Sequence, residues 1–378
     1  MQMDYCDFAG AAAVEILADT ADSASEEPLY TDYTVTTLTV TEAGNYWLTG
    51  YDAINKVAGT AYPNAKKIDA SECAGTVVLV GNYLNNSLIA GEGKSSLWGG
   101  VGGNDAMYGG SSRDMFWYGE GDGNDVAYDF TAGTGDAADV LNLYSGGLQS
   151  VSRSGNVLKL AMADGNGLSV RISSGTDAAV LYTFGAKDSL RGAMIGDSTK
   201  ANSMRYDDSV TYYQGGSGRD VLTLDGGTEA KVVWLDGSKG KSFSGIDVID
   251  GSESSGADQL AGAAASESLY GGRANTSLWG GPGSASDTLR AGTGGNFLYY
   301  GYGEGNDVME DTHWNDTVML YNVSLSQLTG AAISSDAVSI TTTAGQTLTV
   351  NGKAGEFDLA GDGTRWKPNR LTCKWEKL

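Results

Sequence analysis

Hydrophobic and polar positions follow two patterns along the chain, and both predict β-strands. Residues alternate between apolar and polar in 34–40, 157–162 and 337–342, as strands with one buried face do. Between such segments, glycine-rich turns separate short apolar runs such as SLW, which occurs at 96–98 and again at 277–279. This step of about nine residues fits a turn followed by a short strand. The chain is therefore predicted to be all-β.

One stretch of the sequence is duplicated. Residues 68–100 and 249–281 align without a gap and are identical at 15 of 33 positions. Such a duplication predicts two tandem modules. After an N-terminal segment of short helix and linker (1–30), we expect module one at 31–195, with a roll at about 72–126 and a flank at 127–190, and module two at 205–378, with a roll at about 253–308 and a flank at 309–378.

The nine-residue step constrains the architecture. Two steps make one coil of about 18 residues, which advances along the stack by one strand spacing of about 4.8 Å. A coil this short has room for two facing sheets only, so each module is expected to be a short parallel β-roll. Each module contains five of these nine-residue blocks, which predict about two and a half coils. The ends of so short a stack need to be covered. The strands at 139–172 and 316–350 are expected to form antiparallel flanks that do this.

Charge narrows the classes of partner. The net charge is −23 and the pI is near 4.2, which argues against nucleic acid and against an anionic membrane surface. It favours cations with oxygen ligands, whereas the plainer interpretation is a well-solvated acidic surface. The sequence has no run of 18 apolar residues, so no membrane insertion is expected.

The repeated blocks resemble the nonapeptide repeats of the RTX family, the haemolysin-type calcium-binding β-roll proteins, whose pattern is GGxGxDxLx. Examples are AGEGKSSLW at 90–98 and GGRANTSLW at 271–279, and the closing segments YGEGDGNDV (118–126) and YGYGEGNDV (300–308) resemble the end of such a roll. The resemblance implies Ca²⁺ between turns of successive coils on one edge. The sixth residue of each turn and backbone carbonyls at glycines would supply the oxygens.

Most of the aspartates that the family pattern places at position six are replaced here. In module one the position holds Asn86, Ser95, Asp105 and Asp114, and in module two Glu267, Thr276, Asp287 and Asn296. The strongest candidate for calcium is the edge with Asp105 and Asp122, followed by Asp114 and then by Asp287 with Glu304. The alternative is a roll held by hydrogen bonds and packing, with aspartates that only cap turns. The full candidate set is Asp105, Asp114, Asp122, Asp125, Asp287, Glu304 and Asp307.

The ninth position of the blocks is unusually aromatic. In a strand that alternates, this position points away from the core, so aromatic ladders are expected on the roll faces. These side chains either pack against the flanking strands or form an exposed platform for glycans or a partner subunit. The residues are Trp98, Tyr108, Trp117, Tyr270, Trp279 and Tyr299.

No catalytic arrangement is evident from the sequence. A triad would have to use His313, the single histidine, which lies in a turn segment that module one does not share. Cys6, Cys73 and Cys373 lack the spacing of a zinc site, and a disulfide between Cys6 and Cys373 is one pairing that the sequence permits. A non-enzymatic protein is therefore expected.

Three hypotheses about function follow. The first is a secreted, cell-surface structural or adhesin-type protein that binds a few Ca²⁺ ions and whose partners are further copies of itself or surface glycans and proteins. The second, implied by the resemblance, is the calcium-folding and type I export region of a larger secreted enzyme or toxin. The third is a carbohydrate-binding or carbohydrate-active β-helix protein. The N-terminus has aspartate where a signal peptide has lysine or arginine, so another export signal or a longer chain is expected.

Overall fold

The computed structural model describes residues 30–378 except 53–56, 146, 175–178, 185–190 and 359–363. The chain divides into two compact units, residues 1–198 and 199–378. Among the described residues there is no α-helix, and the only helical turn is the 3₁₀ segment Leu325–Gln327. The prediction of an all-β chain is confirmed.

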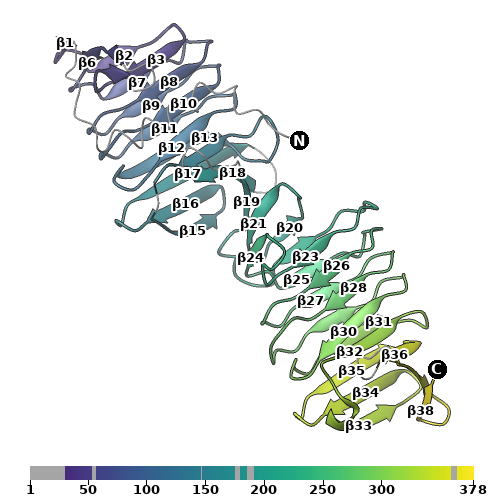
Figure 1. Ribbon diagram of the computed structural model, residues 1–378. Coiled ribbons are helices and arrows are strands. Elements are labelled where there is room, and N and C mark those ends of the chain that lie inside the picture. The colour runs from purple at the N-terminus through teal and green to yellow at the C-terminus, as the bar shows by residue number, and fades with distance from the viewer. Residues whose placement is uncertain (1–29, 53–56, 146, 175–178, 185–190, 359–363) are drawn as a thin grey trace. The chain divides into compact units, whose positions relative to one another are not determined.

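Each unit is a stack of coils in which two sheets of parallel strands face each other (Figure 1). The first sheet of unit one is parallel through six strands and ends in an antiparallel hairpin. Its strands, in spatial order, are β2 (Thr37–Thr39), β7 (Lys67–Asp69), β9 (Ser87–Ile89), β11 (Ala106–Tyr108), β13 (Asn124–Thr131), β17 (Gly167–Ser174), β16 (Val157–Met162) and β15 (Leu148–Ser154).

The second sheet of unit one runs along the opposite side of the same coils. It too is parallel through six strands, and its last strand is antiparallel. The strands are β3 (Gly44–Trp47), β8 (Val77–Val80), β10 (Ser95–Trp98), β12 (Met115–Tyr118), β14 (Val140–Leu143), β18 (Ala179–Phe184) and β19 (Arg191–Ile195). Two small pairs complete the unit, β1 (Tyr30–Thr31) with β6 (Thr60–Ala61) and β4 (Tyr51–Asp52) with β5 (Val57–Ala58).

Unit two repeats this plan. Its first sheet contains β20 (Ser203–Arg205), β22 (Val221–Thr223), β25 (Val248–Asp250), β27 (Ser268–Tyr270), β29 (Thr288–Arg290), β31 (Val308–Thr312), β35 (Thr347–Gly352), β34 (Ala337–Thr342) and β33 (Leu328–Ile333). Its second sheet contains β23 (Val232–Trp234), β26 (Gln259–Ala261), β28 (Ser277–Trp279), β30 (Phe297–Gly301), β32 (Thr317–Tyr321), β36 (Glu356–Asp358), β37 (Arg365–Asn369) and β38 (Lys374–Lys377). β21 (Val210–Gln214) pairs with β24 (Ser242–Ser244).

The length of a coil follows from the strand register. Partner residues in successive coils are 18 apart at Gln259 and Ser277, and 20 apart at Ser277 and Phe297. The central residue of each triplet points between the sheets, and the stacked leucines Leu260, Leu278 and Leu298 are at most 1% exposed. Burial of these stacked apolar side chains is the main contribution to the stability of such a narrow roll.

The parallel stacks are longer than the sequence analysis expected. In unit one they begin at β2 and β3, well before residue 72, and strand β14, expected in an antiparallel flank, pairs in parallel with β12 and β18. The same holds for β32 and β36 in unit two. The nine-residue glycine blocks occur only in coils whose turns are short. Other coils have longer turns, so their strands join the same parallel stack without showing the nine-residue step in the sequence.

Candidate functional site

Position-six side chains form hydrogen-bond ladders along the turns of each roll. In unit one, the backbone N–H of Asn86 donates to Oδ1 of Asp105 (2.6 Å), and the N–H of Asp105 donates to Oδ1 of Asp125 (2.8 Å). On the other edge, Ser95 N–H donates to Oδ1 of Asp114 (2.7 Å). Each carboxylate therefore holds the turn one coil before it, because a buried N–H in a tight turn needs an acceptor.

Unit two contains equivalent ladders. The N–H of Glu267 donates to Oδ1 of Asp287 (2.8 Å), and the N–H of Asp287 donates to Oδ1 of Asp307 (3.0 Å). On the opposite edge, the amide oxygen of Asn296 takes the place of a carboxylate and accepts from the N–H of Thr276 (3.0 Å). Since an amide serves at this position, the ladder requires an acceptor oxygen and not a negative charge.

The second oxygens of several ladder carboxylates are buried and accept no hydrogen bond within the described part of the chain. In unit one these atoms are Oδ2 of Asp105, Asp114 and Asp125. Burial raises the pKa of Asp105 to about 7, and burial raises the pKa of Asp114 and of Asp125 to about 8. An unpartnered buried carboxylate oxygen is costly, so each needs a proton or a cation.

Asp122 and Glu304, two further acids of the closing segments, bind indoles instead of joining the ladders. Nε1 of Trp98 donates to Oδ2 of Asp122 (3.0 Å), and Nε1 of Trp279 donates to Oε1 of Glu304 (3.0 Å). Asp122 also accepts from the hydroxyl of Tyr144 (2.5 Å). The repeat pattern predicts that the turn of Asp122 faces that of Asp105, whereas the backbone partner of Asp105 is Asp125. The carboxylate of Asp122 still lies close enough to raise the pKa of Asp105.

Several ladder residues were missed by the sequence analysis. The N–H of Asp114 donates to Asp139 (2.7 Å), and the N–H of Asn296 donates to Asp316 (2.8 Å). Asp258 likewise accepts from the N–H of Lys231 (2.8 Å). The sequence pattern that identifies such residues is an aspartate directly before a strand, as in DVLNL and DTVML.

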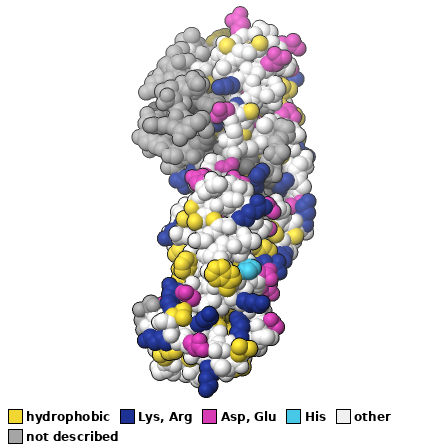
Figure 2. All heavy atoms as spheres, turned by 90° about the vertical axis from the view of Figure 1, so that its right-hand side faces the viewer, with side chains coloured by type: hydrophobic (Ala, Val, Ile, Leu, Met, Phe, Trp, Pro, Cys, Tyr) yellow, Lys and Arg dark blue, Asp and Glu magenta, His cyan; other side chains and the backbone are white. Residues whose placement is uncertain are grey.

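Buried acids account for a large part of the acidic composition. Figure 2 shows hydrophobic, basic and acidic side chains mixed over one face of the molecule, without a continuous acidic patch. A well-solvated acidic surface therefore explains only part of the charge. At least fourteen described acids are buried: Asp105, Asp114, Asp122, Asp125, Asp139, Asp197, Asp220, Asp258, Glu267, Asp287, Glu304, Asp307, Asp316 and Asp358.

The edge that carries Asp105 and Asp125 fits a hard cation in its donor chemistry. Two buried carboxylate oxygens without partners lie on successive turns, and the glycines of these turns pack closely on their surroundings. A Cβ at Gly99 would overlap Oδ2 of Asp105, and a Cβ at Gly123 would overlap the carbonyl oxygen of Gly103. Within the described residues, no three acidic, histidine or cysteine side chains cluster closely enough to hold a metal by themselves. A cation here would therefore depend on backbone oxygens as well.

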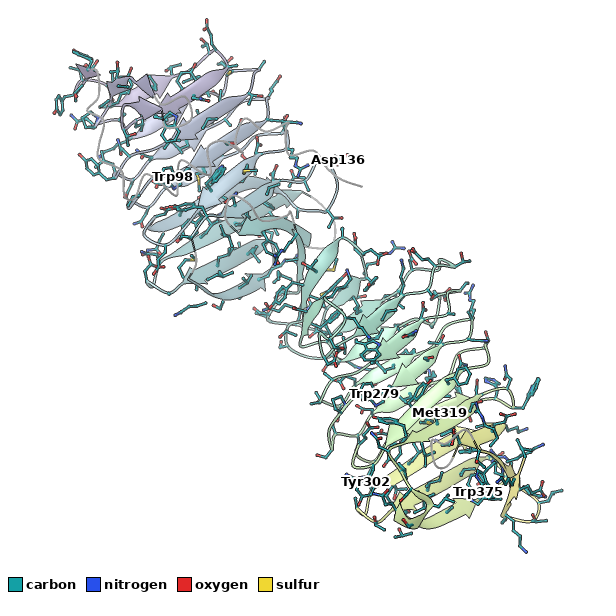
Figure 3. All side chains as sticks on the ribbon, viewed as in Figure 1. Trp98, Asp136, Trp279, Tyr302, Met319 and Trp375 are labelled. Atoms are coloured by element: carbon teal, nitrogen blue, oxygen red, sulfur yellow. The ribbon has the colours of Figure 1, made fainter. Side chains whose placement is uncertain are left out.

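The aromatic position-nine residues lie on the outer faces of the sheets, but the two units differ. Trp98 of unit one and Trp279 of unit two are at equivalent places (Figure 3). In unit one, Trp117 is only 2% exposed, and Tyr108 stacks on Tyr128 with ring centroids 4.5 Å apart. In unit two, Trp279 and its neighbour Tyr299 are half-buried, as Trp98 and Tyr108 are in unit one.

Tyr270 lies on the other sheet of unit two and has basic neighbours. Its hydroxyl accepts from Arg219 (2.9 Å), and the guanidinium of Arg290 lies 5.4 Å from its ring centroid. Tyr270 therefore contributes to a surface contact with arginines and not to the aromatic face around Trp279.

Of the remaining candidates for chemistry, His313 lies beside the ladder residue Asp316. The side chain of His313 is 52% exposed, and its Nδ1 is 3.7 Å from Oδ2 of Asp316. Cys73 is buried and Cys373 is exposed, without a disulfide to another described cysteine, and Cys6 lies outside the described residues. No helix in the described part of the chain is long and apolar enough to cross a membrane.

Comparisons with known proteins add little to this geometry. No protein-family model matches the chain, and no curated protein matches it. Among solved structures, one match is the extracellular lipase LipA from Serratia marcescens, at 14% sequence identity and a TM-score of 0.20, with 77% of this chain and 39% of the lipase chain covered. The β-roll described above therefore rests on the strand register of this chain, and the RTX resemblance rests on its repeats.

Proposed function

We propose that the chain is a non-catalytic, secreted surface or structural protein whose β-roll turns bind calcium. The observation that supports this proposal is the pair of unpartnered oxygens, Oδ2 of Asp105 and of Asp125, on successive turns of one edge. Ca²⁺ takes six to eight oxygens at about 2.3–2.6 Å, and it accepts carboxylates together with backbone carbonyls. Asp105 and Asp125 would supply the charged ligands, and the carbonyls of the glycine turns would supply the rest.

The ladders also explain why the scaffold would not depend entirely on the ion. Oδ1 of each carboxylate holds a backbone N–H of the preceding coil, and the stacked apolar residues between the sheets remain buried with or without a cation. Calcium would neutralise the Oδ2 atoms, which otherwise need protons. The expected role of the ion is to stabilise a folded roll.

The arrangement of the acids supports a non-catalytic role. The position-six carboxylates point into turns and hold backbone groups, and the acids beside the aromatic faces hold indoles. A general acid or base must reach a substrate, which these buried groups do not. Nδ1 of the exposed His313 lies 3.7 Å from Oδ2 of Asp316.

A thermal titration tests the calcium proposal. Melting in EDTA and in millimolar Ca²⁺, with Mg²⁺ as the control ion, should give a rise of about 5–10 °C in calcium only. Replacing Asp105 by alanine should remove more of this rise than replacing Asn296, and Asp136→Asn, an exposed acid, should leave it intact. An equal rise in Mg²⁺, or no rise in either ion, would contradict the proposal.

The export-region hypothesis makes a different prediction. A segment that stays unfolded until it meets external calcium would show a coil-like far-ultraviolet circular dichroism spectrum in EDTA. The continuous apolar stack and the Oδ1 hydrogen bonds of the ladders favour a β spectrum in EDTA instead. A coil spectrum that becomes β on addition of calcium would favour the export region of a larger protein over a scaffold.

A further inference from the structure

The outer face of the second sheet in unit two holds a groove between aromatic rings. Trp234, Ala261, Trp279, Tyr299 and Met319 occupy one register across strands β23, β26, β28, β30 and β32. The small Ala261 separates the two indoles, whose ring centroids are 5.9 Å apart with the planes at 70°. The cavity measures about 410 Å³, and its lining includes Trp234, Gln259, Ala261, Trp279, Tyr299 and Tyr321.

The equivalent residues of unit one are more buried than those of unit two, except Trp98, which is half-buried like Trp279. Trp47, Val80 and Trp117 occupy the places of Trp234, Ala261 and Tyr299, and they are 8%, 3% and 2% exposed. In unit two the indoles of Trp234 and Trp279 are half-buried, and the neighbouring Gln259 is exposed. Half-exposed aromatic rings around a concave space are typical of a ligand site.

The ring at the centre of the groove is held rigidly. Trp279 donates from Nε1 to Oε1 of Glu304 (3.0 Å), and Glu304 is itself held by the backbone N–H of Gly301. Tyr321 packs edge-on against Trp279 with centroids 5.9 Å apart at 82°. A surface fixed in this way loses little conformational entropy when it binds a ligand.

Lysines lie at one end of the groove. The ammonium of Lys239 is 4.2 Å from the ring centroid of Trp234. A second cavity of about 510 Å³ shares Gln259 with the aromatic groove and is lined by Lys231, Lys239 and Lys241 among others.

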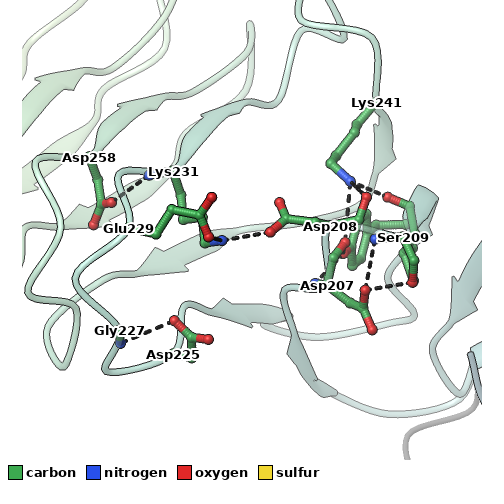
Figure 4. A network of polar contacts seen from close by, with 11 residues as sticks. Asp207, Asp208, Ser209, Asp225, Gly227, Glu229, Lys231, Lys241 and Asp258 are labelled. Carbon is green, nitrogen blue, oxygen red and sulfur yellow. Dashed lines mark hydrogen bonds and ion pairs between the residues drawn. The ribbon is translucent and has the colours of Figure 1, made fainter. Parts of the chain in front are cut away.

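Figure 4 shows that two of these lysines are already engaged. Lys231 pairs with Asp208 (2.6 Å) and Glu229 (2.9 Å), and Lys241 donates to the carbonyls of residues 207, 208 and 210. Lys239 is exposed, and its ammonium lies over the ring of Trp234.

We infer that this aromatic groove binds an acidic oligosaccharide built from uronic acid residues. A pyranose ring has a flat apolar face that can stack on Trp234 or Trp279, and hydroxyls that suit Gln259 and Ser277 at the wall. A carboxylate on such a ring could pair with the ammonium of Lys239. A purely apolar ligand would leave these polar groups without partners. The inference is independent of the calcium proposal, because no ladder carboxylate lines the groove.

The lysines make an anionic ligand compatible with an acidic protein. Charges more than about 8 Å apart are largely screened from each other at physiological ionic strength. The attraction of an anion to the groove therefore depends more on the nearest charged groups than on the net charge of −23. The second cavity contributes the three lysines with Asp208 and Glu229, and the carboxylate of Glu304 is held by the indole of Trp279. Lys239 therefore decides between an acidic and a neutral sugar.

The test is a titration of the full chain with tetragalacturonate, followed by tryptophan fluorescence and calorimetry. Because uronates bind Ca²⁺, the titration is carried out in EDTA and repeated at fixed free calcium. Trp234→Ala should weaken binding at least about tenfold, and Lys239→Gln should weaken it about three- to tenfold. The controls Trp314→Ala and Lys353→Gln, at exposed positions outside the groove, should bind as the parent does.

Neutral cellotetraose separates the role of the lysine from that of the rings. It should bind several-fold more weakly than tetragalacturonate, and Lys239→Gln should not change that affinity. Absence of tetragalacturonate binding by a folded chain, equal affinity for both sugars, or full affinity in Trp234→Ala would overturn the inference. Binding of an apolar peptide in place of the sugar would also overturn it. None of these results bears on the calcium melting experiment.

Discussion

The backbone N–H of Asp105 donates a hydrogen bond of 2.8 Å to Oδ1 of Asp125, a residue one coil further along the roll. This contact joins two turns of one edge and leaves Oδ2 of both aspartates buried without a partner among the described residues. In Asp125, Oδ1 therefore holds the turn of Asp105, whereas Oδ2 would bind a cation. Substitutions can separate the two tasks.

Asp125→Asn should keep the ladder and lose the calcium ligand. The amide oxygen can still accept from Asp105, as that of Asn296 accepts from Thr276. We expect stability in EDTA at pH 7 to be unchanged or higher, because an amide needs no proton to be neutral when buried, and the calcium-induced rise in Tm to shrink. Asp125→Ala should instead cost about 1–3 kcal/mol in EDTA, because the N–H of Asp105 loses its acceptor. Urea unfolding of both variants provides the comparison, and equal losses would argue against the ladder.

The buried acids predict that stability depends more steeply on pH without calcium than with it. Burial raises the pKa of Asp114 and Asp125 to about 8, whereas an unfolded aspartate titrates near about 3.9. Between these values the folded chain holds protons that the unfolded chain has released, so stability in EDTA should fall as the pH rises from about 4 to 8.

Calcium competes with those protons. The rise in Tm on adding calcium should therefore grow from pH 5 to pH 8. Melting curves over this range in EDTA and in calcium check both slopes. The double variant Asp114→Asn, Asp125→Asn should flatten the slope in EDTA, and a slope that it leaves unchanged would assign the titration to other groups.

The roll could be predicted from the sequence because its inward positions repeat one apolar residue per strand. Leu260, Leu278 and Leu298 lie in register between the sheets, as the nine-residue step implies. The extent of the roll could not be predicted in the same way. Val221 pairs with Val248 and Met115 pairs with Val140, and the turns between these strands are too long to preserve the step.

The sites were predicted less well than the fold, for a related reason. The closing segment of module one has Asp122 and Asp125 three residues apart, and spacing alone does not say which lies in the ladder. The choice depends on Trp98, which binds Asp122 from the preceding coil. The groove at Trp279 depends in turn on the small residue Ala261 and on the exposure of one sheet face, which is set by tertiary packing.

The indole–carboxylate contact of unit one should couple two residues energetically. Trp98→Phe removes the N–H that donates to Asp122 and should destabilise the chain by about 1 kcal/mol beyond the packing it loses. A double-mutant cycle with Asp122→Asn should give a coupling energy of about 0.5–3 kcal/mol. Trp314→Phe, at an 81% exposed tryptophan, should change stability by less than about 0.5 kcal/mol. A coupling energy near zero would mean that Asp122 and Trp98 act separately.

Two neighbouring glycines provide a matched test of how tightly the coils stack. Gly121 and Gly123 both have positive φ, at 94° and 104°, so alanine at either should cost about 1–2 kcal/mol for the backbone conformation. At Gly121 a Cβ meets nothing within 4 Å, whereas at Gly123 it would overlap the carbonyl oxygen of Gly103 in the preceding coil.

Gly123→Ala should therefore destabilise the chain by at least about 2 kcal/mol more than Gly121→Ala. It should also reduce the calcium-induced rise in Tm, because the turn that presents Asp125 must move away from the turn of Asp105. Urea unfolding and calcium melting of the two variants check both expectations. If the two alanine variants were equally stable, the coils could not be stacked as closely as the hydrogen bond between Asp105 and Asp125 requires.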